Sequence, residues 1–267
     1  LVGSMYYGGT VEDSWWNGGT ENSVNSTGNY VGGLVGYLNS GTIATSWSSG
    51  SVTGQNSYVG GLVGFSYKSS SVNNSYSTAT VTGANQAGGL VGRMDGSGII
   101  RGSYATGSVY GSSLVGGLVG SVYYGGTIED SWWNGGTENS VTSTGNYVGG
   151  LVGYNRSGTI LTSYAVGQVS SENSYVGGLV GYNMDGEISG SYTETDVSGS
   201  IAVGGLAGYN ASNSLISDSY AAGSISGNDY VGGLVGNNHS GTVETSNASG
   251  NVSGRNYVGG LVGYNYS

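Results

Sequence analysis

Residues 149–153 read Gly-Gly-Leu-Val-Gly, and this pentapeptide or a close variant recurs along the whole chain. Its leucine occupies nine positions: Leu34, Leu62, Leu90, Leu118, Leu151, Leu179, Leu206, Leu234 and Leu261. Successive leucines are 27 or 28 residues apart except for one interval of 33 residues, and Leu1 extends the series by a second interval of 33. A period this strict indicates one structural unit that is stacked many times.

Each unit contains three short segments of strand length, separated by turn residues. In the unit that starts at Leu151, the predicted strands span 151–154, 159–165 and 168–170. Asn, Gly and Ser at 155–158, 167 and 171–174 supply the positive φ angles and local hydrogen bonds that corners need. The sequence therefore predicts an all-β fold, a parallel β-solenoid of about ten coils with three short strands each, most coils having 27–28 residues and two having 33. Coils about 4.7–4.9 Å apart would form a rod roughly 45–50 Å long.

Stacking aligns equivalent residues of successive coils into ladders. Beside the core leucines runs a second apolar ladder: Ile43, Val72, Ile100, Ile128, Ile160 and Ile188. A serine ladder comprises Ser46, Ser75, Ser103, Ser163, Ser191 and Ser219, with the same residue at Ser14, Ser131 and Ser246. An aromatic residue follows most of these serines: Trp15, Trp47, Tyr76, Tyr104, Trp132, Tyr164, Tyr192 and Tyr220. Four residues after the core leucine, the second half of the chain carries Asn155, Asn183, Asn210, Asn238 and Asn265. We expect the aromatic rings to stack and the asparagines to hydrogen-bond from coil to coil.

A repeated stripe of valine and tyrosine is a candidate lateral interface. Strict alternation around the core leucine would turn six of these side chains outward: Val31, Val35, Tyr37, Val63, Val152 and Tyr154. Exposed apolar ladders of this kind would form a contact surface. A bulge at the corner could instead turn the valines inward, and the sequence leaves both arrangements open.

The chain is expected to form a single solenoid domain over residues 1–267, as a window of a longer array. Residues 6–36 and 123–153 are nearly identical, which indicates a larger repeat of four coils: 1–117, 118–234 and a partial copy at 235–267. The extra residues of each long coil, near 12–19 and 129–136, should bulge from one corner. Both ends are in phase with the repeat and lack caps, so the array should continue or stack end to end with another copy.

Composition restricts the partners. The chain has 57 glycines, no proline, no cysteine and a net charge of -10. This charge disfavours nucleic acid and anionic membranes, and no apolar run approaches the roughly 18 residues of a membrane span. Without cysteine, backbone pairing and packing must hold the fold.

The residues of known catalytic sites are sparse or dispersed. His239 is the only histidine, too few for a zinc peptidase site or a Ser-His-Asp triad. The carboxylates are spread over different coils, unlike a polysaccharide-cleaving groove. We therefore expect a protein that is not an enzyme and binds no cofactor. Calcium at Asp95-Gly96, Asp185-Gly186 or the Glu-Asp pairs is an alternative, but Asp-Gly is also an ordinary turn pair.

The recurrence of Gly-Leu-Val-Gly with Gly-Thr-Ile, Ser-Tyr-Ala and Gly-x-Val-Ser-Gly resembles the GLUG-motif repeat family of bacterial and archaeal surface proteins. The resemblance covers the whole chain. It implies an extracellular, cell-surface or secreted location, because the family's repeats occur in adhesins and in some secreted metallopeptidases. It implies a stalk or display role and transfers no catalytic residue, since the motif itself is not catalytic.

These observations together predict a non-enzymatic structural or adhesive repeat protein, a stalk or fibre-forming segment. The expected partners are further copies of the chain, end to end or laterally, or other surface proteins. The alternatives are a face that binds host or matrix glycans, a polysaccharide-active face, or an ice-binding face. The candidate ice-binding row beside the third-strand valine includes Thr53, Thr82 and Thr142, but Tyr110 interrupts it.

Overall fold

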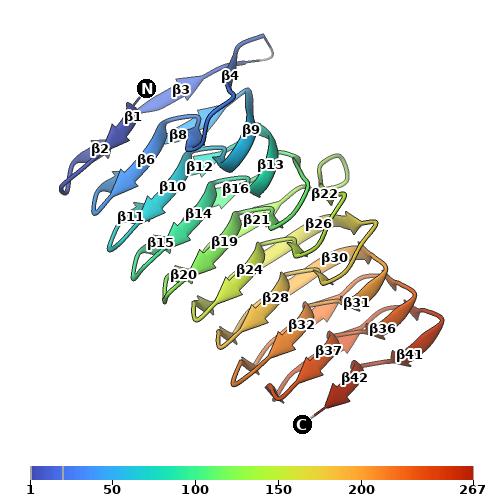
Figure 1. Ribbon diagram of the computed structural model, residues 1–267. Helices are drawn as coiled ribbons and strands as arrows, with labels where there is room; N and C mark the ends of the chain where they lie inside the picture. Colours follow the sequence, from blue (N-terminus) through green and yellow to red (C-terminus); the bar gives the residue numbers. More distant parts are fainter. Residues whose placement is uncertain (1, 20, 267) are drawn as a thin grey trace.

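The structure, a computed structural model, describes residues 2–19 and 21–266, so Leu1 of the leucine series lies outside it. The chain winds into coils stacked along one axis, with the two termini at opposite ends (Figure 1). Each complete coil contributes one strand to sheet A, one to sheet B, and two or three strands to sheet C. Neighbouring coils pair in parallel on all three sides. The predicted parallel β-solenoid is confirmed, with nine complete coils and a tenth strand in sheet A.

Sheets A and B each take one strand from every coil. Sheet A contains β1 (Val2–Met5), β6 (Val35–Asn39), β10 (Val63–Tyr67), β14 (Val91–Asp95), β19 (Val119–Tyr123), β24 (Val152–Arg156), β28 (Val180–Met184), β32 (Ala207–Ala211), β37 (Val235–His239) and β42 (Val262–Tyr266). Sheet B contains β2 (Thr10–Glu12), β7 (Thr42–Ala44), β11 (Ser71–Asn73), β15 (Ile99–Arg101), β20 (Thr127–Glu129), β25 (Thr159–Leu161), β29 (Glu187–Ser189), β33 (Leu215–Ser217) and β38 (Thr242–Glu244). In both sheets each strand pairs only with its equivalents in adjacent coils.

Sheet C forms the third side, and its strands range from two to ten residues. Its first five coils contain β3 (Trp15–Asn17), β4 (Ser23–Ser26), β5 (Val31–Gly32), β8 (Trp47–Ser49), β9 (Ser51–Gly60), β12 (Tyr76–Ser77), β13 (Thr80–Gly88), β16 (Tyr104–Ala105), β17 (Val109–Gly111), β18 (Val115–Gly116), β21 (Trp132–Asn134), β22 (Ser140–Ser143) and β23 (Val148–Gly149). The last four contain β26 (Tyr164–Ser171), β27 (Val176–Gly177), β30 (Tyr192–Ser198), β31 (Ile201–Gly204), β34 (Tyr220–Ala222), β35 (Ile225–Ser226), β36 (Asp229–Gly232), β39 (Asn247–Ser249), β40 (Val252–Ser253) and β41 (Asn256–Gly259).

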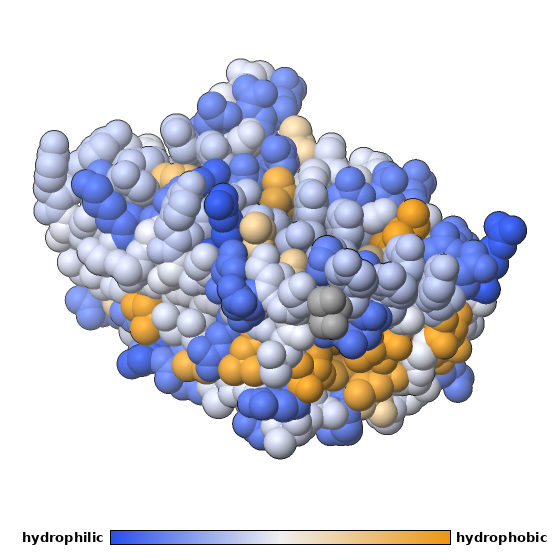
Figure 2. Space-filling model, turned by 60° about the horizontal axis from the view of Figure 1, so that its bottom comes forward, coloured by the Kyte–Doolittle hydropathy of each residue, from blue (hydrophilic) through white to orange (hydrophobic). Residues whose placement is uncertain are grey.

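The core runs along the stack and is built from the two apolar ladders. The core leucines from Leu34 to Leu234 are fully buried, as are Ile43 and its five successors. In the last coil Leu261 is 41% exposed. The face in Figure 2 is mostly hydrophilic or neutral, with a band of apolar residues along its lower part and smaller apolar patches elsewhere. In the described part of the chain, no helix is long and apolar enough to cross a lipid bilayer.

One predicted strand is divided differently in the structure. The segment 159–165 was expected to be continuous and to end before Gly167, but the corner lies at Thr162, whose φ is 44°. The chain then continues through Gly167 in β26 without leaving the sheet. A φ of 135° at Gly167 bends the strand, yet its pairing with Thr195 persists. A glycine therefore marks a bend here, and the corner falls beside a serine.

Of the two valine orientations that the sequence leaves open, the outward one is wrong. Val31 is 4% exposed, and Val35, Val63 and Val152 are 0% exposed. Within β6 both Val35 and Leu38 are buried, and residues three apart cannot share one face of a strictly alternating strand. Alternation is interrupted at Gly36, which is the inward alternative that the sequence left open. Serine substitutions at these valines would therefore damage the core.

The glycines of the pentapeptide are required by close packing of backbones. A Cβ on Gly60 would lie well inside van der Waals contact with the Val63 carbonyl oxygen. A Cβ on Gly61 would collide with the Gly89 carbonyl of the next coil. Only residues without a side chain allow the chain to turn from sheet C into sheet A at this distance.

Candidate functional site

The serine ladder closes the corner between sheets B and C. From Ser14 to Ser219, each backbone N–H donates to the hydroxyl of the serine in the next coil, at 3.1–3.2 Å. Each of these hydroxyls donates in turn to the carbonyl two residues earlier, as in Ser163 Oγ to Leu161 O at 2.7 Å. The hydroxyl thus accepts an N–H that has no carbonyl partner at the corner, and a buried N–H without an acceptor is costly.

The asparagine ladder lies inside sheet A, as the spacing predicted. Each Nδ2 donates to the Oδ1 of the asparagine in the next coil, at 2.7–2.9 Å, along the file Asn155, Asn183, Asn210, Asn238 and Asn265. The first three side chains are 0% exposed. Three of the amides also donate to a glycine carbonyl of the adjacent corner, as in Asn155 Nδ2 to Gly158 O at 3.0 Å. These polar groups hold coils together and are not free to bind a ligand.

The aromatic ladder runs along the outside of sheet C and consists of Trp15, Trp47, Tyr76, Tyr104, Trp132, Tyr164, Tyr192 and Tyr220. All seven consecutive pairs are stacked, with interplanar angles of 2–10° and centroid distances of 4.9–6.2 Å. Asn247 takes the equivalent position in the last coil. Because each ring covers its neighbour's face, the ladder presents mainly ring edges to solvent. Stacking of a sugar on an aromatic face is therefore disfavoured along it.

A second aromatic surface lies where sheet C meets sheet A. We call Tyr147, Tyr154, Tyr175, Tyr182 and Tyr209 the tyrosine face. Tyr147 and Tyr175 stack at 5.2 Å, and both meet Tyr182 edge to face. Burial, followed by the neighbouring hydroxyl of Tyr209, raises the pKa of Tyr182 to about 12. Among the residues predicted for a lateral interface, Tyr37 and Tyr154 lie half-buried on this side of the rod.

The tyrosines at this corner play a backbone role that the sequence reasoning missed. Tyr30, Tyr58, Tyr147 and Tyr175 all have φ between 61° and 67°. Corners were assigned to Gly, Asn and Ser, since non-glycine residues rarely adopt this conformation. The signal was present in the sequence, because a tyrosine precedes the Val-Gly-Gly of most coils.

In the first half of the chain, Arg93 occupies the position that Tyr154 and Tyr182 hold in the tyrosine face. Arg93 pairs in register with Phe65, and its guanidinium lies 4.1 Å from the ring centroid of Tyr123. It also forms an ion pair with Asp95, a residue considered for calcium. The ion pair gives the Asp95 carboxylate a partner of opposite charge, and the cation–π contact holds Arg93 in place.

The two long coils bulge as expected, but within sheet C, between β3 and β4 and between β21 and β22, and not at a corner. The strands that precede the two bulges differ in packing. Trp133 in β21, the strand before the second bulge, is fully buried, and its Nε1 donates to the Gly107 carbonyl at 3.1 Å. Its counterpart Trp16 is only half-buried. The same Trp-Trp-Asn strand is therefore better packed where a full coil precedes it.

A shallow polar trough lies on sheet C beside the second bulge. Two adjoining hollows of about 290 and 240 Å³ share Gln168 and Asp196. The first is walled by Gly136 and Thr137 of the bulge and also contains Glu194. Asp196 accepts the Ser224 backbone N–H at 2.8 Å. The trough is open and acidic and could hold a polar chain.

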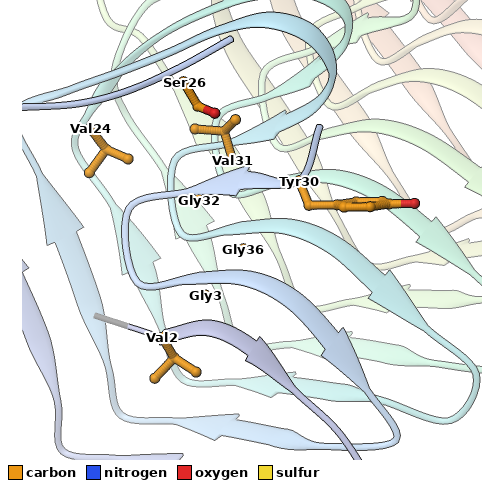
Figure 3. A pocket seen from close by; sticks show the side chains of 8 residues that line it. All are labelled: Val2, Gly3, Val24, Ser26, Tyr30, Val31, Gly32 and Gly36. Carbon is orange, nitrogen blue, oxygen red and sulfur yellow. The ribbon is translucent and has the colours of Figure 1, made fainter. Parts of the chain in front are cut away.

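A cavity of about 360 Å³ lies at the first coil (Figure 3). The side chains of Val24 and Val31 line it, whereas the ring of Tyr30 points away from them (Figure 3). Val24 pairs with the core residue Val52, and Val2 pairs with the core residue Val35. The cavity is thus a cross-section of the core and has no catalytic character.

The remaining sequence candidates are dispersed. Among residues 2–19 and 21–266, no three His, Cys, Asp or Glu side chains form a group able to hold a metal ion. His239 Nδ1 lies 2.8 Å from the Tyr209 hydroxyl, at one edge of the tyrosine face. Asp185 has a φ of 51° and serves as a corner residue.

Comparison with known proteins agrees with the repeat. The family model described as the GLUG motif matches residues 55–82, 83–110, 172–198, 199–226 and 227–253, just over half of the chain. No curated protein matches the chain significantly. No solved structure does so either. The coils outside these five matches pair in the same parallel register, as in Ile128 with Ile160. On the family-model match and the shared coil geometry, the chain belongs to the GLUG-motif family.

Proposed function

We propose that this chain is a non-enzymatic stalk or fibre segment of an extracellular or cell-surface protein. The observation that carries the proposal is the unbroken coil-to-coil pairing of sheet A through ten strands. Since each coil bonds only to its neighbours, length increases by one strand spacing, about 4.8 Å, for every coil added. Such a rod sets the distance between whatever lies at its two ends.

The side chains support this role because their polar groups bridge adjacent coils. The serine and asparagine ladders use hydroxyls and amides as structural bonds along the rod axis. The aromatic ladder adds seven stacked contacts along the same axis. These contacts resist bending and separation of coils, which a stalk under load requires.

The near-repeat of four coils provides a direct test of the spacer role. Tandem duplication of residues 118–233 keeps the leucine period and adds four coils, so the maximum dimension in small-angle X-ray scattering should rise by about 19 Å at constant cross-section. Deletion of the same residues should shorten the rod equally. An unchanged length with a thicker particle would contradict the spacer role.

The proposed location is tested separately. Antibodies raised against the purified chain should label intact cells of the source organism or filaments shed from them. Labelling that requires permeabilised cells would refute an extracellular stalk. An internal protein of the same cells, labelled only after permeabilisation, serves as the control.

Glycan adhesion is the second candidate, and the polar trough favours it. Gln168, Glu194 and Asp196 offer exposed hydrogen-bonding groups beside a bulge wall. Binding to matrix or host polysaccharides in a pull-down, lost in the double variant Glu194→Gln and Asp196→Asn, would support adhesion. Two coils after the first bulge, the positions equivalent to these carboxylates hold Thr78 and Thr80. A Thr78→Val variant should therefore bind normally.

A further inference from the structure

The tyrosines of the aromatic ladder are stacked in pairs and are also accessible to solvent. Tyr76 and Tyr104 have centroids 4.9 Å apart and planes within 2°. Tyr192 stacks on Tyr164 at 4.9 Å and on Tyr220 at 5.0 Å. Each tyrosine of these pairs retains some exposure to solvent, and Tyr220 is 37% exposed. Phenol rings are thus both paired and accessible.

The strand register places these tyrosines side by side in adjacent coils. Tyr76 pairs directly with Tyr104, and Tyr164 with Tyr192, in parallel strands of sheet C. The ring planes are within 2° in the first pair and 10° in the second, so the two phenols of each pair lie face to face. Trp132 lies between Tyr104 and Tyr164, which divides the phenols into two separate blocks.

We propose that the tyrosines of the aromatic ladder are a site of oxidative cross-linking, in which dityrosine bonds join neighbouring coils covalently. The oxidant is a one-electron oxidant of the haem peroxidase class acting with hydrogen peroxide. Tyr76 joins Tyr104 in the first block, and Tyr192 joins Tyr164 or Tyr220 in the second.

The chemistry balances with this oxidant. Each phenol loses one electron and its hydroxyl proton, and the two radicals form one carbon–carbon bond between ring positions adjacent to the hydroxyls. The hydrogen atoms on those carbons then move to the oxygens, which restores two phenols. Per cross-link, two electrons and two protons reduce one hydrogen peroxide to two waters.

The rest of the molecule indicates why this bond would matter. The chain contains no cysteine, so disulfides cannot join its coils. A bond between residues 28 positions apart removes conformational freedom from the unfolded chain, as a disulfide does. Tyr182 and Tyr209 also stack, at 4.8 Å, but Tyr147 and Tyr175 pack edge to face around them and limit access for an oxidant.

The test treats dilute full-length protein with a haem peroxidase and hydrogen peroxide. After digestion, mass spectrometry should find Tyr76–Tyr104 and Tyr192 linked to Tyr164 or Tyr220, within single chains. Linkage of Tyr104 to Tyr164 should be missing because Trp132 separates them. Cross-links only between chains, linkage at Tyr182–Tyr209 in preference to the ladder, or tryptophan oxidation without dityrosine would overturn the proposal.

Phenylalanine variants separate the chemistry from folding. Tyr192→Phe keeps the stacked ring, so the fold should persist by circular dichroism while all second-block cross-links disappear and Tyr76–Tyr104 remains. Tyr182→Phe, outside the ladder, should leave both blocks unchanged. The oxidised native protein should unfold several-fold more slowly in urea than the oxidised double variant Tyr104→Phe and Tyr192→Phe. Equal unfolding rates would refute the stabilising role.

Discussion

The two halves of the solenoid fill the same inner position of sheet A in different ways. In the first half this position holds Leu38, Ser66, Met94 and Val122. In the second half it holds the asparagine ladder, which begins where Val122 pairs with Asn155. The backbone register is the same in both halves. A solenoid core therefore accepts either apolar packing or a continuous polar file at one position.

The junction between the halves shows what the polar file requires. Asn155 Oδ1 is buried without a hydrogen-bond partner among the described residues, because Val122 in the preceding coil has no donor. The later asparagines each accept an amide from the coil before. Where the corner is one residue longer, after Asn210, the Ser214 hydroxyl bonds to the Ala211 and Asn183 carbonyls. An asparagine is thus tolerated in this core mainly beside another asparagine.

The largest effect should come from placing an asparagine in the wrong half. Leu38→Asn removes a fully buried leucine and puts an amide beside Met5 and Ser66, so we expect a loss of about 3–5 kcal/mol in unfolding free energy. Val122→Asn is the matched control, because its amide can donate to Asn155 Oδ1. Urea denaturation should show Val122→Asn at least about 1 kcal/mol less destabilising. Equal losses would show that neighbouring asparagines do not matter.

Interrupting the file should cost somewhat less. Asn183→Leu leaves Asn155 without its acceptor and Asn210 without its donor, and we expect a loss of about 2–4 kcal/mol. Met94→Leu changes the equivalent position of the first half at similar volume and should cost less than about 1.5 kcal/mol. Both values come from chemical denaturation followed by circular dichroism. If Asn183→Leu were neutral, the ladder would add no net stability.

Breaking the serine ladder should destabilise the protein equally in either half. Ser103→Ala leaves the buried Ser75 N–H without its acceptor, and Ser191→Ala leaves the Ser163 N–H without its acceptor. Each should lose about 1–2 kcal/mol, and amide hydrogen exchange should speed up at Ser75 or Ser163 alone. Threonine at the same positions is the control, because it keeps the hydroxyl that accepts the N–H. Unequal losses would mean that the halves differ beyond the inner position.

The smallest effect concerns alkaline pH. The pKa of Tyr182 is raised by burial to about 12, above the value of about 10 for an unfolded chain. Its contribution to stability is therefore complete below pH 10 and is lost as pH rises towards 12. Tyr182→Phe, which copies Phe65 of the first half, should shift the alkaline unfolding midpoint upward and leave stability at pH 7 nearly unchanged. A midpoint that does not move would exclude Tyr182 from alkaline unfolding.

The period of the sequence was sufficient to predict the solenoid and the residues aligned in each ladder. A spacing of 27 or 28 residues fixes which residues share a register, whatever the shape of the coil. The apolar, serine, aromatic and asparagine ladders follow from that spacing alone. The hydrogen bonds within the ladders could not all be predicted from the spacing, which did not show that serine hydroxyls accept the corner N–H groups.

The direction of each side chain was decided by tertiary structure. Val35 points inward because Gly36 interrupts alternation, and the corner falls at Thr162 instead of Gly167. Tyr30 and its equivalents adopt positive φ because the glycines of the following coil pack against their backbone. Local propensity cannot show this, because the strain is offset only once coils stack. The sequence alone thus determined which residues meet, and the folded stack determined which way they point.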